Sequence, residues 1–243
     1  MIRHIKTFCL LMLIASCKTV SIEQSSHSIT KQQVVMGSVG LDRNLLLEHG
    51  YSNAAIPKYG NPIKVTTMQV PFSKQTHKAF VNAKTTQVAN INVKYADTLK
   101  DKPKFVKLDV ADKVALIEAL NAKENKAVKD YLSTDYNASV ITSISMALDS
   151  QMLNDIANAD AVFLVQNGLK SYGIQLFDND KATKTIGFNE GIIFSYNSSN
   201  CCWQENDKHR INIVDIVVGK TNCPDRTYPS AKQAKRKINY FKL

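Results

Sequence analysis

Alternating apolar and polar side chains recur along the chain and predict β-strands. In residues 104–110, for example, Val106, Leu108 and Val110 are separated by charged residues. A period of two turns one row of side chains toward a core and the other toward water. The pattern predicts strands over 64–72, 87–96, 104–110, 139–147, 161–165, 171–177, 183–188, 192–196 and 211–218. We expect the second and third of these strands to form a hairpin across residues 97–103.

A helical spacing of apolar residues interrupts this strand pattern. It predicts three short helices: one containing Val114, Ile117 and Leu120, one over 124–132, and one over 150–157. Asp112 is a suitable N-cap for the first of them. A fourth helix is predicted over 42–50, because Asp42 stands at its N-cap position and Gly50 at its stop.

Turn residues divide the second half of the chain into an antiparallel pattern. Asn167-Gly168 is the strongest hairpin signal, because both residues tolerate the positive φ of a type I′ turn. Asp178-Asn179-Asp180 and Asn189-Glu190-Gly191 mark two further turns. Together these elements predict an α+β fold, a mainly antiparallel sheet with three or four short helices in a single domain. The alternative is a split at 112–133 into two small β-rich domains.

The N-terminus has the regions of a bacterial export signal. A basic start precedes an apolar run over 8–14, and the small residues Ala15 and Ser16 follow it. The run is too short to span a bilayer, which takes about 20 residues. The sequence Leu13-Ile14-Ala15-Ser16-Cys17 resembles the lipobox of bacterial lipoproteins. The resemblance implies removal of residues 1–16 and acylation of Cys17 by a diacylglyceryl group and a fatty acid such as palmitate.

The resemblance also predicts where the protein is held. Lys18 replaces the acidic residue that retains enterobacterial lipoproteins in the inner membrane, so the outer membrane is favoured. Residues 18–23 contain a single acid, which favours the periplasmic face over display on the cell surface. The first expected partner is therefore the lipid bilayer, through acylated Cys17.

Composition along the chain predicts four segments. Residues 1–16 are the cleaved signal peptide, and 17–35, which are polar and rich in Ser and Gln, form a lipidated N-terminus and flexible tether. Residues 36–229 form the mixed α+β globular domain. Residues 230–243 are a basic tail, either a solvated end or a contact for an anionic surface.

The charge of the chain narrows the classes of partner. Removal of 16 of the 243 residues leaves 227, with a net charge of +8. Lysine outnumbers arginine 26 to 5, and lysine lacks the bidentate geometry that sequence-specific nucleic-acid binding favours. We therefore expect no nucleic acid and consider an envelope protein, an anionic glycan or a lipid surface as further partners. The oligomeric state stays open.

Three cysteines would remain beside Cys17 in the mature chain. Adjacent cysteines rarely pair, so we expect Cys223 to form a disulfide with either Cys201 or Cys202. The remaining thiol is a candidate nucleophile, with Asp207 and His209 nearby in the sequence, or a link to another chain.

Recognisable catalytic, metal and cofactor motifs are missing from the sequence. The mature histidines, His27, His49, His77 and His209, have no metal-site spacing, and we predict no catalytic residue, metal or cofactor. The leading hypothesis is a non-enzymatic binding or assembly module of the cell envelope. The alternatives are a hydrolase acting on glycan, peptide or lipid, and an inhibitor of the immunity type.

Overall fold

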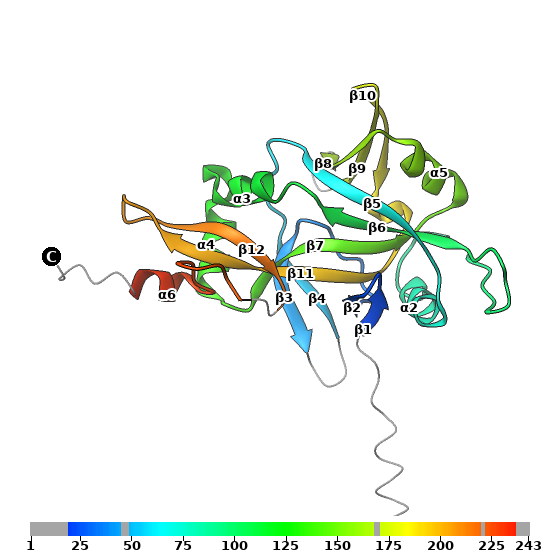
Figure 1. Cartoon of the computed structure of the whole chain (residues 1–243), viewed down its shortest axis with the longest axis horizontal. Coiled ribbons are helices and arrows are strands. Elements are labelled where there is room, and N and C mark those ends of the chain that lie inside the picture. The colour runs from blue at the N-terminus through cyan, green and yellow to red at the C-terminus, as the bar shows by residue number, and fades with distance from the viewer. Residues whose placement is uncertain (1–18, 45–48, 168–170, 220–221, 237–243) are drawn as a thin grey trace, which may run out of the picture.

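Two long central strands organise the fold. They are β7 (Ala138–Ala147) and β11 (Ile192–Glu205), which pair antiparallel and lie side by side in the computed structural model (Figure 1). The register shifts twice along this pair, between Ile193 and Ser195 and between Asn197 and Ser198. Such bulges bend a strand and strengthen its twist. The structure describes residues 19–44, 49–167, 171–219 and 222–236.

Ten further strands complete one twelve-stranded sheet within the described residues. Its main path runs β1-β2-β11-β7-β6-β5-β8-β9-β10, and neighbouring strands along this path pair antiparallel. These strands are β1 (Thr19–Ile22), β2 (Ser25–Ile29), β5 (Ile63–Pro71), β6 (Lys104–Val110), β8 (Ala161–Asn167), β9 (Ser171–Asp178) and β10 (Lys181–Gly187). Off the path, β3 (Val39–Asn44) pairs with β4 (His49–Ala55) and β7, and β12 (Ile211–Val218) pairs with β11.

The sheet branches at its two central strands. β2 and β12 share the edge of β11 that faces away from β7, β2 at residues 195–196 and β12 at 199–205. In the same way, β3 and β6 share the outer edge of β7. The chain therefore leaves a gap along β11, between the end of β2 and the end of β12.

Short helices cover both faces of the sheet. They are α2 (Lys74–Lys84), α3 (Lys113–Asn121), α4 (Lys126–Thr134), α5 (Ser150–Asn158) and α6 (Ala231–Arg236), with 3-10 turns η2 (Lys123–Asn125) and η3 (Phe188–Glu190). Val106 and Leu108 belong to a large core with α3 and α4, whereas Phe105 joins a smaller core under α2. Because neighbouring residues of a strand point to opposite faces, the two cores lie on opposite sides of the sheet.

Most of the predicted architecture is confirmed. The fold is α+β, with one continuous sheet in place of the two small β-rich domains kept as an alternative. Asp112 caps α3 by accepting a hydrogen bond from Ala115 N at 2.9 Å. The strands predicted from residue 139 onward and the helix over 150–157 are present, most of them at nearly the expected bounds. The exception is the strand predicted over 192–196, which continues to Glu205 as β11.

Three predictions from the first half of the chain are wrong. The helix over 42–50 is replaced by the ends of the β3–β4 hairpin, while residues 45–48 lie outside the described residues. The strand over 87–96 is an extended segment without a ladder, although Ile91 is buried against the smaller core. The predicted hairpin across 97–103 is absent too, because β6 pairs with β5 and β7.

A fourth correction concerns the tether predicted over 17–35. Residues 19–29 form the β1–β2 hairpin, which buries Val20, Ile22 and His27. Val20 and Ile22 pack in the smaller core with residues of α2, and burial of these two apolar side chains favours the hairpin. Within the basic tail over 230–243, α6 is helical and buries Ala234, and residues 237–243 lie outside the described residues. No described helix is long and apolar enough to cross a membrane.

Candidate functional site

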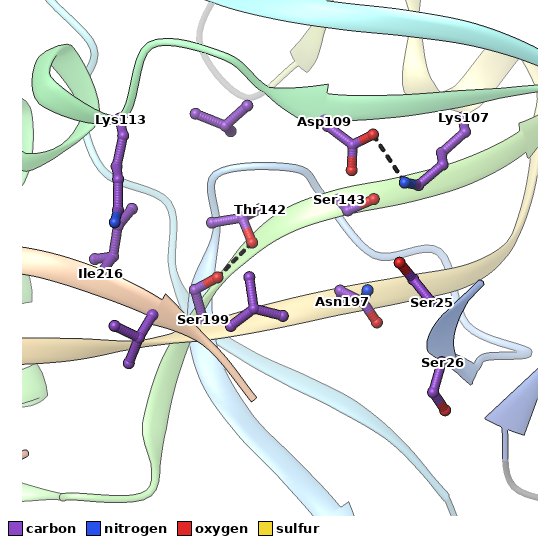
Figure 2. Close-up of a pocket in the computed structure, with 13 residues that line it drawn as sticks. Ser25, Ser26, Lys107, Asp109, Lys113, Thr142, Ser143, Asn197, Ser199 and Ile216 are labelled. Atoms are coloured by element: carbon purple, nitrogen blue, oxygen red, sulfur yellow. Dashed lines mark hydrogen bonds and ion pairs between the residues drawn. The ribbon is translucent and has the colours of Figure 1, made fainter. Parts of the chain in front are cut away.

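A pocket occupies the gap at the branch of the sheet. Its volume is about 630 Å³, and β2, β6, β7, β11, β12 and the start of α3 all contribute to its lining (Figure 2). Six neutral polar residues line it: Ser25, Ser26, Thr142, Ser143, Asn197 and Ser199. The remaining lining is Lys107, Asp109, Val110, Lys113, Ile216, Val217 and Val218. We refer to it as the branch-point pocket.

The charges in the lining are paired. Lys107 Nζ lies 3.1 Å from Asp109 Oδ2 on the same strand, and Lys113 Nζ forms an ion pair with Asp215 beside the pocket. Two such pairs leave little net charge for a ligand to neutralise. A ligand of this pocket is therefore expected to be neutral and to bind through hydrogen bonds.

Hydrogen bonds of hydroxyl and amide groups connect the strands that line the pocket. The Thr142 and Ser199 hydroxyls are 2.6 Å apart and join β7 to β11 (Figure 2). Asn197 Nδ2 donates to the carbonyl oxygens of Tyr196, at 3.0 Å, and Ser26, at 2.9 Å. The Asn197 amide thus bridges β11 and β2 where their backbone ladder stops.

A row of polar side chains continues from this pocket across the sheet. The register pairs Asp109 with Ser143 and Lys107 with Ser145, and β11 extends both pairs to Asn197 and Ser195. Because directly paired residues share a face, these side chains lie on one side of the sheet. On β2, Ile29 pairs with Ser195 and therefore lies on this face. His27 is two residues before Ile29 on the same strand, so it lies on this face too. The polar stripe comprises His27, Lys107, Asp109, Ser143, Ser145, Ser195 and Asn197.

Four members of the polar stripe are buried without a hydrogen-bond partner among the described residues. They are both ring nitrogens of His27 and the hydroxyls of Ser143, Ser145 and Ser195. A buried polar group without a partner costs about 1–3 kcal/mol, so such groups are rare in proteins. Their concentration beside a pocket marks this stripe as a functional candidate.

His27 is the only titratable member of this unpartnered set. Burial, and secondarily the charge of Lys107, lowers its pKa from 6.5 to about 4, although Asp109 opposes the shift. The imidazole is therefore neutral at neutral pH. A neutral imidazole is a hydrogen-bond donor at one nitrogen and an acceptor at the other. The His27 ring therefore contributes one donor and one acceptor to the polar stripe, which lies on the same face of the sheet as the pocket.

The described cysteines, Cys201, Cys202 and Cys223, lie outside the pocket lining. The structure joins Cys202 and Cys223 in a disulfide, with a Cα–Cα distance of 5.7 Å, so Cys202 is the partner left open by the sequence. Cys201 is buried, and burial raises its thiol pKa to about 12. Since the thiolate is the reactive form, Cys201 is a poor nucleophile.

The other predicted candidates are scattered. His209 Nδ1 lies 3.1 Å from Glu205 Oε1 in the β11–β12 connection, and the His77 ring stacks on Tyr95 at 4.8 Å. No group of three or more His, Cys, Asp and Glu residues in the described part of the chain is arranged to hold a metal. Cys17, the predicted lipidation site, lies outside the described residues.

Sequence reasoning missed the polar stripe. Ser143 and Ser145 alternate with Ile144 and Met146, which resembles a half-exposed strand. The structure covers this polar row as well as the apolar one. One feature of the sequence could have indicated burial of this row. An exposed row of a strand often carries charged residues, whereas these positions carry serine.

Comparison with known proteins adds little. No family model and no curated protein matches the chain. A solved structure described as "Cryo-EM structure of the Gasdermin A3 membrane pore" aligns over 91% of this chain and 95% of its own, at 9% identity and a TM-score of 0.28. A likeness this low carries no argument about fold or function.

Proposed function

We propose that this chain is a lipid-anchored protein of the cell envelope that binds a small, neutral, polar ligand in the branch-point pocket. The anchor is acylated Cys17, and the favoured location is the periplasmic face of the outer membrane. The protein acts as a binding module and carries out no reaction itself. The observation that carries this proposal is the polar stripe, whose buried, unpartnered groups adjoin a pocket of ligand size.

The pocket suits a ligand of mixed character. One part of its wall supplies the hydroxyls of Ser25, Ser26 and Ser143, and another supplies the aliphatic side chains of Val217 and Val218. Ligand sites commonly combine an apolar wall with a few oriented polar groups. A neutral sugar or a similar polyol, with hydroxyls at one side and C–H groups at the other, satisfies both walls.

Binding is favoured over catalysis by the state of the candidate nucleophiles. Cys201 is buried with a raised thiol pKa, and Cys202 is in a disulfide. The Ser143 hydroxyl has no hydrogen bond to the His27 ring, so the base that would activate it is not engaged. The state of these three groups therefore supports binding rather than group transfer.

The anchor is tested by labelling cells with palmitate. The native chain is expected to take up the label and to sediment with membranes, and Cys17→Ala is expected to lose both properties. Cys9→Ala is the matched control, because Cys9 lies in the predicted signal peptide and its loss leaves the lipobox intact. Equal labelling of the Cys17→Ala protein would contradict the anchor.

The pocket is tested by saturation-transfer NMR with a panel of neutral mono- and disaccharides. We expect transfer to at least one sugar and its loss in Val217→Trp, which places an indole in the pocket. Val214→Trp is the control, because Val214 is on the same strand but does not line the pocket. Transfer that is equal in both variants would place binding elsewhere.

A further inference from the structure

The position of the first strand limits the distance between the domain and the membrane. β1 begins at Thr19, two residues after Cys17. Two residues of extended chain span at most about 7 Å. If Cys17 carries the lipid, as the proposed function requires, Thr19 therefore lies at the level of the lipid headgroups. The domain then rests against the bilayer with the side that surrounds β1.

The neighbours of β1 identify that side. Val20 and Ile22 of β1 pack in the smaller core with Ala79 and Phe80 of α2. Thr19 pairs with Ser28 near the end of β2. α2 and the chain that follows it are thus part of the outer surface beside the anchor.

The segment after α2 is fastened to the same place. Thr86 Oγ1 donates to the carbonyl of Lys31, just beyond β2. Gln87 Nε2 donates to Ile193 O at 2.6 Å, and Gln87 Oε1 accepts from Ile193 N at 2.9 Å. These contacts hold Val88, which is fully exposed, on the surface next to the β1–β2 hairpin.

The charge of this surface matches an anionic bilayer. Residues 73–104, which comprise α2 and the following segment, contain seven lysines and two aspartates, a net charge of +5. Residues 112–135, which carry α3 and α4 on the opposite face of the sheet, contain four lysines and five acids, a net charge of −1. Lys74, Lys78 and Val81 are exposed on α2. Lysines with exposed apolar side chains among them are typical of surfaces that lie on anionic headgroups.

We infer that the surface formed by α2 and residues 85–104, the basic face, lies against the anionic phospholipid headgroups of the membrane that holds the anchor. This inference rests on the proposed function through Cys17. It assigns the domain a fixed orientation, with α3 and α4 turned away from the bilayer. The short link and the basic face act together, because a second contact strengthens a single lipid anchor.

The experiment uses the acylated full chain in phosphatidylcholine vesicles that contain phosphatidylglycerol. A fluorescent label is attached to a cysteine introduced by Val81→Cys or Val88→Cys, and to Val114→Cys of α3 as the control. All three valines are exposed, whereas Cys201 is buried and Cys202 and Cys223 are joined, so the introduced thiol takes the label. Nitroxide headgroups in the vesicles quench a label that touches the membrane.

We expect the labels at Val81 and Val88 to be quenched severalfold more than the label at Val114. Lys74→Gln with Lys78→Gln should weaken this contact by about fivefold for each lysine, as should vesicles without phosphatidylglycerol. Lys123→Gln with Lys126→Gln, on the α3–α4 side, should leave it unchanged.

Two negative results have different meanings. A chain that carries palmitate but shows equal quenching at all three valines overturns the basic face and leaves the anchor intact. A chain without palmitate overturns the anchor and the inference together, because the short link from Cys17 is what brings β1 to the headgroups.

Discussion

Two neighbouring regions on one face of the sheet are built on opposite principles. Under α2, the rings of Phe72, Phe80, Phe105 and Phe194 form an aromatic cluster, in which Phe72 and Phe105 have centroids 4.9 Å apart. Beside it on the same face of the sheet, the polar stripe buries serines of β7 and β11 and a histidine of β2 without partners. Side-chain packing stabilises the first region, whereas the second lowers the stability of the fold.

The difference between the regions indicates where function lies. Both contain buried side chains, and β6 and β11 contribute to both, through Phe105 and Phe194 in the first and Lys107 and Ser195 in the second. The same backbone could have carried apolar side chains throughout, so its geometry does not explain the serines. A cost that no contact within the described chain offsets is expected at a binding site, where the offset comes from a ligand.

The largest expected effect comes from the aromatic cluster. Phe105→Ala removes a fully buried ring at its centre and should lower the free energy of unfolding by about 4 kcal/mol. Urea denaturation measures the change. Ligand binding at the pocket should persist in the fraction that remains folded. A loss below about 1 kcal/mol would mean that the cluster does not stabilise the domain as described.

A second effect concerns the pocket wall that β12 supplies. The disulfide closes the chain over a sequence separation of 21, so Cys202→Ala with Cys223→Ala should lower the free energy of unfolding by about 3 kcal/mol. The strand that carries Ile216 and Val217 lies inside this loop. We therefore expect binding to weaken as well, in contrast to the aromatic variant. Native binding in the double variant would show that the disulfide does not position this wall.

The polar stripe should give the protein a characteristic pH dependence. The folded pKa of His27, about 4, lies below its ordinary value of 6.5, so the unfolded chain binds more protons between these values. The free energy of unfolding should therefore fall by about 3 kcal/mol as the pH falls from 6.5 to 4, and this contribution should change little outside that window. His27→Phe should remove this part of the pH dependence. A native pH profile in that variant would contradict the burial of a neutral imidazole.

The smallest effects separate two kinds of serine. Ser145→Ala removes an unpartnered hydroxyl and should raise the free energy of unfolding by about 1 kcal/mol. Ser199→Ala breaks the contact with Thr142 and should lower it by a similar amount. Ligand affinity should fall for Ser199→Ala, whose residue lines the pocket. A destabilising Ser145→Ala would show that this hydroxyl has a structural role.

Much of the fold could be predicted from local pattern. Alternation located β6, and Asp112 marked the start of α3. The same alternation over 87–96 gave a wrong prediction of a strand. A period of two indicates an extended chain with one buried side, but it does not indicate a hydrogen-bonded partner strand. Residues 19–29 gave the opposite error, because their polar composition predicted a flexible tether although Val20 and Ile22 are buried.

The candidate site was harder to predict because it depends on tertiary register. Ser143, Asn197 and His27 are far apart in the sequence and share a face through strand pairing and alternation. The branch that opens the pocket also depends on two bulges, which have no sequence signature. By contrast, the cysteine count reduced the disulfide to two choices, of which the structure has Cys202 with Cys223.

The most direct test of the account is native mass spectrometry of the protein extracted in mild detergent from its own membrane. We expect a non-covalent adduct of small mass on the native chain and on Val214→Trp, and its loss from Val217→Trp. Dissociation of the adduct would then identify the ligand. Native and Val217→Trp chains that carry the same adduct, or none, would contradict the assignment of the branch-point pocket as the binding site.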